Sequence, residues 1–130
     1  MTISSKLESS EYRKEAFKSG KMLLKTSQKA AQHRTGSYRL LGVYYWLVEE
    51  QTKALKWWQK AIEEGERLGA RPELSRAYFE VGKRLLEAKS KYKELNGIEA
   101  EEYLEKAKAL FEEMDLQWDL DELDKIIASI

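Results

Sequence analysis

Acidic side chains carry most of the chemical capacity of this sequence, because it has no cysteine and a single histidine, His33. Without cysteine there can be no disulfide, no thiolate nucleophile and no cysteine-based zinc site. Neighbouring carboxylates such as Glu101 and Glu102 suit general acid–base catalysis in principle, but helical spacing places them on helix exteriors, where nothing holds a substrate. Further pairs of this kind include Glu63-Glu64 and Glu112-Glu113.

The acidic residues near the C-terminus do not have the pattern of a calcium site. Their spacing does not match a calcium-binding loop, and no glycine lies at the bend. The sequence also lacks a phosphate-binding glycine loop and a nucleophile elbow. We therefore predict no catalysis, no metal and no cofactor. The acidic residues in question are Asp115, Asp119, Asp121, Glu122 and Asp124.

The balance of charge argues against nucleic-acid and membrane partners. Lysine plus arginine and aspartate plus glutamate each number 23, so the formal net charge is zero. Such a chain has no general attraction to nucleic acids or to anionic membranes. No run of about 18 apolar residues occurs, and the first residues lack the apolar core of a signal peptide. We expect a cytoplasmic protein.

Composition and periodicity predict an all-α fold, an antiparallel array of about six helices. Charged residues make up 35% of the chain, there is one proline, and no alternating strand pattern is present. The pattern favours an N-terminal helix over about 9–31, a break at 32–36 and a second helix over about 37–50. The apolar stripe of the second helix is Tyr38, Leu41, Gly42, Tyr45 and Val48.

A third helix is predicted from about 51 to 68, ending at Gly69 in a left-handed C-cap. Its short link to the preceding helix makes the two antiparallel neighbours. Pro72 suits the first turn of a fourth helix, over about 72–88. The insertion 88–97 either extends this helix or forms a loop.

The C-terminal part is predicted to hold a helix over about 99–114, a turn at 115–118 and a last helix over 120–128. Asp119 followed by Glu122 has the spacing of an N-cap residue and its reciprocal partner. We expect this last helix to cover the exposed face of the preceding hairpin.

Small residues recur at long spacing in this chain. Forty positions separate Gly42 from Gly82, and 46 separate Ala54 from Ala100. Such periods indicate stacked helical hairpins, in which small residues let two backbones approach. The pattern resembles the tetratricopeptide repeat in a long-helix variety. The matching signature residues are Tyr38, Leu41, Gly42, Tyr45, Ala54, Trp58 and Ala61, then Tyr78, Gly82, Ala100, Leu104 and Ala107.

The resemblance implies a single domain over 1–130. Its parts are an N-terminal half unit (9–31), a first repeat (35–69), a second repeat (72–114) with the insertion 88–97, and a capping helix (119–128). The chain departs from the family in its inter-helix turn, where Glu49-Glu50 replaces glycine, and in lacking a proline after the second helix. Residues 36–125 also resemble, more loosely, C-terminal repeat segments of bacterial multidomain signalling ATPases and nucleotide cyclases.

In tetratricopeptide folds the first helix of each pair lines a concave groove, and this implies a partner-binding face. An aromatic and basic groove suits a peptide or helix with acidic and apolar anchors. The alternative is that Trp46 and Phe79 pack against the N-terminal helix or a second copy. Trp58 is expected in the hairpin core and Trp57 against the next repeat. The groove residues are Arg39, Val43, Trp46, Leu47, Arg76, Phe79, Lys83 and Leu86.

The sequence thus predicts a non-catalytic protein–protein interaction module that binds a protein or peptide. The alternative function is a regulatory or self-association segment of a larger multidomain signalling enzyme. Its basis is the incomplete first unit, which leaves apolar surface to be covered.

Overall fold

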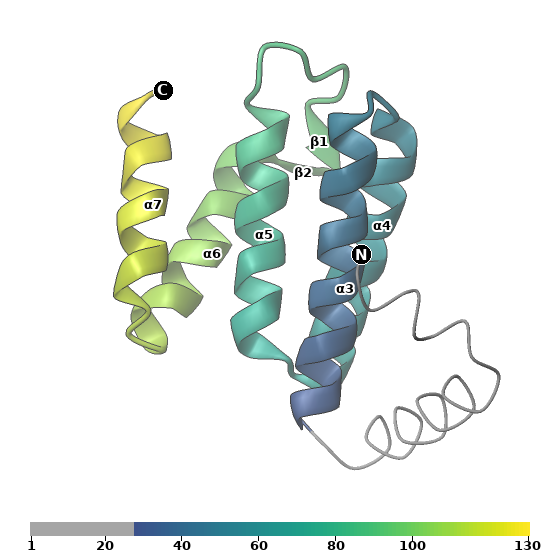
Figure 1. Cartoon of the computed structure of the whole chain (residues 1–130). Coiled ribbons are helices and arrows are strands. Elements are labelled where there is room, and N and C mark those ends of the chain that lie inside the picture. The colour runs from purple at the N-terminus through teal and green to yellow at the C-terminus, as the bar shows by residue number, and fades with distance from the viewer. Residues whose placement is uncertain (1–27) are drawn as a thin grey trace, which may run out of the picture.

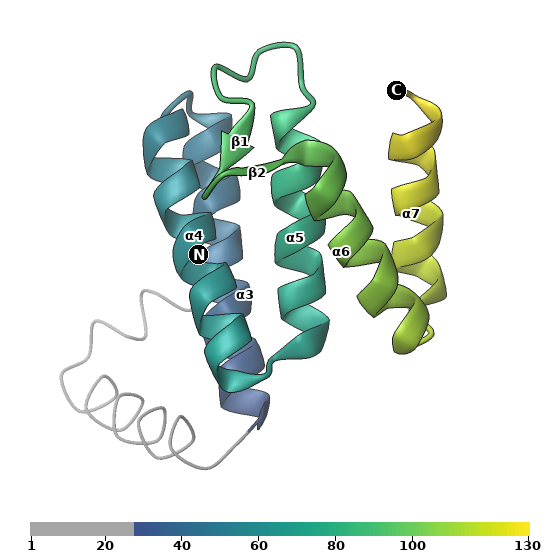
Figure 2. The same cartoon turned by 180° about the vertical axis from the view of Figure 1, so that it is seen from behind.

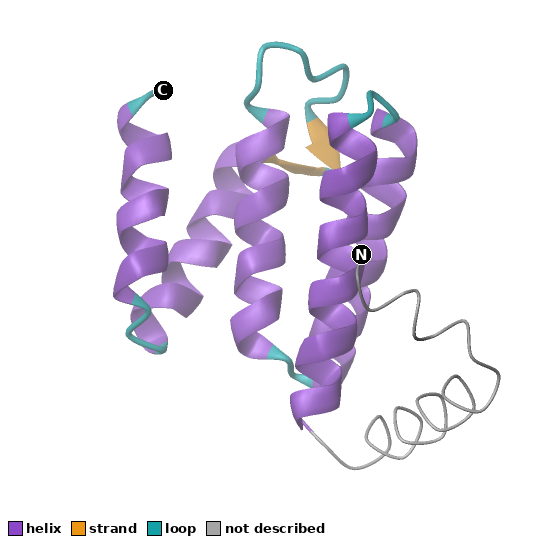
Figure 3. Cartoon of the chain, in the orientation of Figure 1, coloured by secondary structure: helices purple, strands orange, loops and turns teal. Residues whose placement is uncertain are grey.

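The computed structural model describes residues 28–130, and this part is helical apart from one short β-hairpin (Figures 1 and 3). The predicted all-α class is confirmed for it. The expected N-terminal half unit at 9–31 lies mostly outside the described residues. The elements are α3 (Gln28–Leu47), α4 (Gln51–Leu68), α5 (Arg71–Leu85), β1 (Glu94–Leu95), β2 (Ile98–Glu99), α6 (Ala100–Glu113) and α7 (Gln117–Ala128).

The helices form two layers, with α3, α5 and α7 on one side and α4 and α6 on the other (Figures 1 and 2). Successive helices run antiparallel, so that α3 pairs with α4 and α5 pairs with α6. None of the helices α4 to α7 has a side-chain hydrogen bond at its N-cap. Their stability therefore depends on packing between helices rather than on side-chain capping of their N-termini.

The turn chemistry between α4 and α5 follows the prediction. Gly69 has φ 67°, in the left-handed region that ends many helices, and α4 stops at Leu68. Pro72 lies in the first turn of α5, where its missing N–H leaves no helical hydrogen bond unmade.

Helix α3 is continuous, so the predicted break at 32–36 is wrong. The residues in this stretch are held as helix by the corner where α4 meets α5. The side-chain oxygen of Gln32 accepts a hydrogen bond of 2.8 Å from the backbone N–H of Glu73, and Arg34 pairs with Glu64 at 3.0 Å. Gly36 faces the side chain of Glu73.

The helices of the α3–α4 hairpin approach each other closely at Gly42, where the side chain of Trp58 packs on the backbone of α3. A Cβ atom at this position would lie 2.1 Å from Nε1 of Trp58, so only glycine fits under the indole. Trp58 is fully buried, as predicted, and its N–H donates to the carbonyl of Arg39 at 3.1 Å. The second hairpin has the same arrangement, with a Cβ on Gly82 falling 2.8 Å from the side chain of Leu104. These contacts let the helices of each pair approach closely.

The insertion forms a loop and a two-stranded hairpin, and the alternative of a longer helix is wrong. Helix α5 ends at Leu85, and β1 pairs antiparallel with β2 so that Leu95 lies opposite Ile98. Asn96 and Gly97 both have positive φ, as a two-residue hairpin turn requires. Tyr103 donates its hydroxyl proton to the carbonyl of Leu95 at 2.7 Å, and burial raises the pKa of this tyrosine to about 12.

The loop before this hairpin is tied to the first turn of α4. The side-chain amide of Gln51 donates to the carbonyl of Lys89 at 3.0 Å and accepts from the N–H of Lys91 at 2.9 Å. Thr52 Oγ1 and the Tyr92 hydroxyl share a hydrogen bond of 2.7 Å. The insertion therefore connects the two hairpins at the end opposite the α4–α5 link (Figure 1).

Helix α7 begins at Gln117, three residues earlier than predicted, and its N-cap is Leu116. Asp119 is therefore a buried residue of the first turn, and its predicted N-cap role is wrong. Its carboxylate instead accepts a hydrogen bond from Arg76 of α5. In the part of the chain that the structure describes, no helix is long and apolar enough to cross a membrane.

Thr35→Val should stabilise the fold by about 1 kcal/mol, because a buried hydroxyl without a partner is replaced by a methyl group of similar size. Thr35 is fully buried, and its Oγ1 has no hydrogen-bond partner among the described residues. The control is Thr52→Val, which removes a bonded hydroxyl. Urea unfolding followed by circular dichroism measures both, and a destabilised Thr35→Val variant would contradict the prediction.

Gly42→Ala should destabilise the fold by about 2 kcal/mol, the usual penalty for forcing an extra methyl group into a packed contact. Gly36→Ala, in the same helix, is the matched control. Its Cβ would meet only the flexible end of the Glu73 side chain, at 3.1 Å, so helix propensity should leave it neutral or more stable by up to about 1 kcal/mol. Equal melting temperatures for the two variants would refute this account of the crossing.

Candidate functional site

The predicted groove residues lie on α3 and α5, which share one layer with α7 (Figure 1). The structure does not bring all eight together on one open face. It divides them into buried, charge-paired and open residues, and α7 adds side chains that the sequence did not assign to the groove.

Trp46 belongs to the core, and so it leaves the partner-binding set. Its side chain has no exposed surface, and its ring lies 5.4 Å from that of Trp58. Its indole N–H donates to Oε1 of Glu87 at 2.9 Å. Of the two alternatives for Trp46, packing is correct, but the contacts are with α4 and with the residues after α5.

The carboxylate of Glu87 is held in its charged form by its partners. Burial raises the pKa of this carboxyl, but hydrogen bonds from Trp46 and Arg84 outweigh burial and hold the pKa below its ordinary value of 4.5. The Arg84 bond measures 2.7 Å. The Glu87 carboxylate thereby accepts hydrogen bonds from both the buried indole N–H of Trp46 and the guanidinium of Arg84.

The two predicted groove arginines are neutralised within the molecule. Arg39 pairs with Glu73 at 3.1 Å, and Arg76 pairs with the other oxygen of Glu73 at 3.2 Å and with Asp119 at 3.3 Å. Burial disfavours the charged form of Arg76, but hydrogen bonds and charge from Asp119 and Glu73 outweigh it and raise its pKa. This network joins α3, α5 and α7.

Phe79 and Lys83 lie one turn apart on α5. The Phe79 ring is half-buried and packs edge to face on Phe111, with centroids 6.1 Å apart. Lys83 Nζ lies 5.3 Å from the centroid of the Phe79 ring and 3.6 Å from Glu80. Val43 is half-buried against the core, whereas Leu47 is 59% exposed.

A groove of about 400 Å³ lies between the C-terminal ends of α5 and α7. Two of the predicted residues, Lys83 and Leu86, are in its lining. The other lining residues are Glu87, Ile126, Ser129 and Ile130. The groove therefore combines aliphatic side chains with the ammonium group of Lys83 and the carboxylate of Glu87.

Sequence reasoning missed the contribution of α7. The predicted groove residues all belong to the first helix of each pair, so they do not include Ile126 or Ile130. The regular order of the helices could have indicated this contribution. In an antiparallel array α7 lies beside α5 in the same layer, so its side chains belong to the same face. Trp57 was also misplaced, since it packs on Tyr38 of its own hairpin, with ring centroids 5.6 Å apart.

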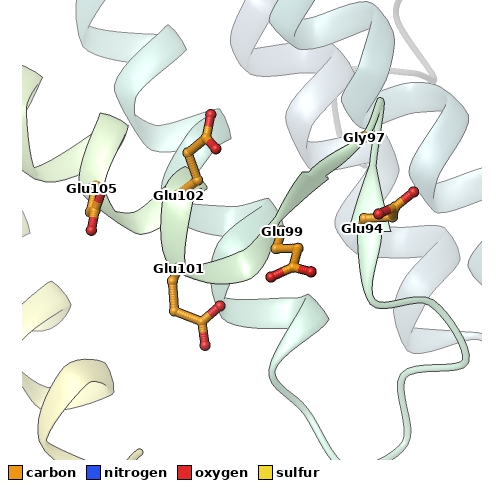
Figure 4. Close-up of a pocket in the computed structure, with 6 residues that line it drawn as sticks. All are labelled: Glu94, Gly97, Glu99, Glu101, Glu102 and Glu105. Carbon is orange, nitrogen blue, oxygen red and sulfur yellow. The ribbon is translucent and has the colours of Figure 1, made fainter.

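A second hollow, of about 370 Å³, lies beside the β-hairpin and is strongly acidic (Figure 4). Glu94 lies directly opposite Glu99 in the hairpin, an arrangement in which like charges repel. In the described part of the chain, no group of three His, Asp or Glu side chains is placed to hold a metal ion. The lining residues are Glu94, Gly97, Glu99, Glu101, Glu102 and Glu105.

Comparison with protein-family models, with curated proteins and with solved structures finds no match to this chain.

Glu87→Gln should be less stable than the wild type by about 1 kcal/mol at pH 7, because charged hydrogen bonds are weakened. The folded pKa of Glu87 lies below 4.5, so its stabilising contribution is full above that pH and is lost as the pH falls through the folded pKa. The difference between variant and wild type should therefore shrink on acidification.

Urea unfolding at about pH 7, about pH 5 and about pH 3.5 measures this difference in the free energy of unfolding. Asp124→Asn, on the exposed side of α7, controls for the loss of one carboxylate. A Glu87→Gln difference that is constant across the three conditions would contradict the assignment.

Proposed function

We propose that this chain is a non-catalytic protein–protein interaction module of tetratricopeptide type. It binds a short peptide or helix on the α3/α5/α7 layer, in the groove between the ends of α5 and α7. The observation that carries the proposal is the lining of this groove, in which the aliphatic side chains of Leu86, Ile126 and Ile130 accompany the charged groups of Lys83 and Glu87.

The repeat assignment is supported by the two antiparallel hairpins, α3–α4 and α5–α6. Each has a glycine on its first helix beneath a large side chain of its second, Trp58 over Gly42 and Leu104 over Gly82. Ala54 and Ala61 of α4, and Ala107 of α6, have no exposed surface. The small residues of the repeat pattern therefore lie where the helices cross.

The chemistry of the groove indicates the kind of partner. Aliphatic walls favour an apolar anchor such as leucine, isoleucine or methionine. Lys83 favours an acidic residue next to that anchor, because its side chain is 30% exposed and its contact with Glu80 is long, at 3.6 Å. Arg39 and Arg76 contribute less, because Glu73 and Asp119 already neutralise them.

Panning a random peptide library on the wild-type chain should enrich sequences with an aliphatic residue adjacent to aspartate or glutamate. Fluorescence anisotropy of the enriched peptides should then show binding weakened about tenfold by Ile126→Ser and by Lys83→Ala, which corresponds to about 1.4 kcal/mol each. Lys108→Ala, on the exposed side of α6, is the control and should bind as the wild type does. Peptides that bind all four chains equally would contradict the groove assignment.

A further inference from the structure

Helix α3 carries an exposed apolar stripe, and we propose that it is the contact surface for a second copy of this chain. The stripe consists of Leu40 (58% exposed), Leu41 (38%), Tyr44 (57%), Leu47 (59%) and Val48 (48%). The described part of the chain has nine exposed large apolar side chains, and these five are concentrated in nine consecutive positions, the last turns of α3 and the residue that follows it.

The five side chains share one face of α3. Their spacing of i, i+1, i+4, i+7 and i+8 is that of a single helical stripe, and the N–H of Val48 still bonds the carbonyl of Tyr44 at 3.1 Å, so the helical spacing continues to the end. The opposite face, with Gly42 and Trp46, is buried against α4 and the core. The stripe is therefore the face of α3 that points away from the rest of the described chain.

The spacing of the five stripe residues is the same whether it is counted from the N-terminal or the C-terminal end. Its intervals are one, three, three and one residues, so Tyr44 is its centre. Two such helices placed antiparallel about a two-fold axis at Tyr44 bring Leu40 opposite Val48, and Leu41 opposite Leu47. A two-fold interface requires such a self-complementary surface, because each patch meets its own copy.

The charges around the stripe favour the same partner. No charged residue occurs from position 40 to position 48. An acidic or basic partner would find no counter-charge there, whereas a second copy buries no charged group at the centre of the contact.

The area is sufficient for a weak dimer. Five large side chains that are each about half exposed offer on the order of 500 Å² per copy, hence ~1,000 Å² for a pair, which is the lower limit for a specific interface. We therefore expect a dissociation constant in the micromolar range rather than an obligate dimer.

Residues 1–27 are the other candidate to cover the stripe, and the experiments below distinguish them from a second copy.

Sedimentation equilibrium of the full chain, from about 1 to about 200 µM, tests the proposal. The wild type should show a monomer–dimer equilibrium, and Tyr44→Glu and Tyr44→Lys should each weaken it at least tenfold, because like charges meet on the two-fold axis. An equimolar mixture of the two variants should restore dimers, since opposite charges then face each other. The control is Trp118→Glu, an exposed aromatic of α7, which should dimerise as the wild type does.

Because the chain has no cysteine, disulfide trapping gives a second measurement. Leu40→Cys mixed with Val48→Cys should cross-link faster under oxidation than either variant alone. A wild type that stays monomeric at all concentrations, or a charge mixture that stays monomeric, would overturn the proposal. If Tyr44→Glu instead lowers the melting temperature of a monomer, the N-terminal segment covers the stripe, and the proposal is equally overturned.

Discussion

The indole of Trp58 lies directly on the backbone of α3 at Gly42, and this contact sets the separation of the first hairpin. Any side chain at position 42 would overlap the ring. Because the helices approach so closely, the indole N–H reaches the carbonyl of Arg39, and Trp46 is enclosed beside Trp58 without exposed surface. Packing at this density is specific, since an added methyl group has no space to enter. The second hairpin uses Gly82 for the same purpose.

This packing decides which part of the α3/α5/α7 layer can meet a partner. Trp46 is drawn into the core, and the charge of Arg39 is taken up by Glu73. The ion pairs that cross the layer end at Asp119, in the first turn of α7. Beyond them, toward the C-terminal ends of α5 and α7, the groove is lined by aliphatic side chains together with Lys83 and Glu87. These two charged groups pair with Glu80 and Arg84, so the groove combines apolar walls with groups from a second set of ion pairs.

Periodicity and small-residue spacing predicted the helices from 51 onward to within a few residues, with the helix end at Gly69 and the burial of Trp58, because these depend on local pattern. The continuity of α3 through 32–36 could not be predicted, since it depends on contacts with Glu73, some 40 residues away in sequence. The same holds for Asp119, whose partner is on another helix. In the site, the tetratricopeptide resemblance pointed to Lys83 and Leu86, which line the groove, but it could not show that Trp46 turns inward or that α7 supplies Ile126.

The hydrogen bonds from Gln51 and Thr52 to the loop after α5 have a mechanical consequence. The two hairpins are joined covalently at one end, through Gly69 and Ala70, and are held at the other end by these three bonds (Figure 1). The two hairpins are therefore connected at both ends and cannot open about a single hinge. These bonds act together with the contacts of Gln32 and Arg39 of α3 with Glu73 of α5, and both sets hold the angle between the hairpins. A ligand arriving at the α3/α5/α7 layer meets a surface whose shape is already set, so little of its binding free energy is spent on rearranging the helices.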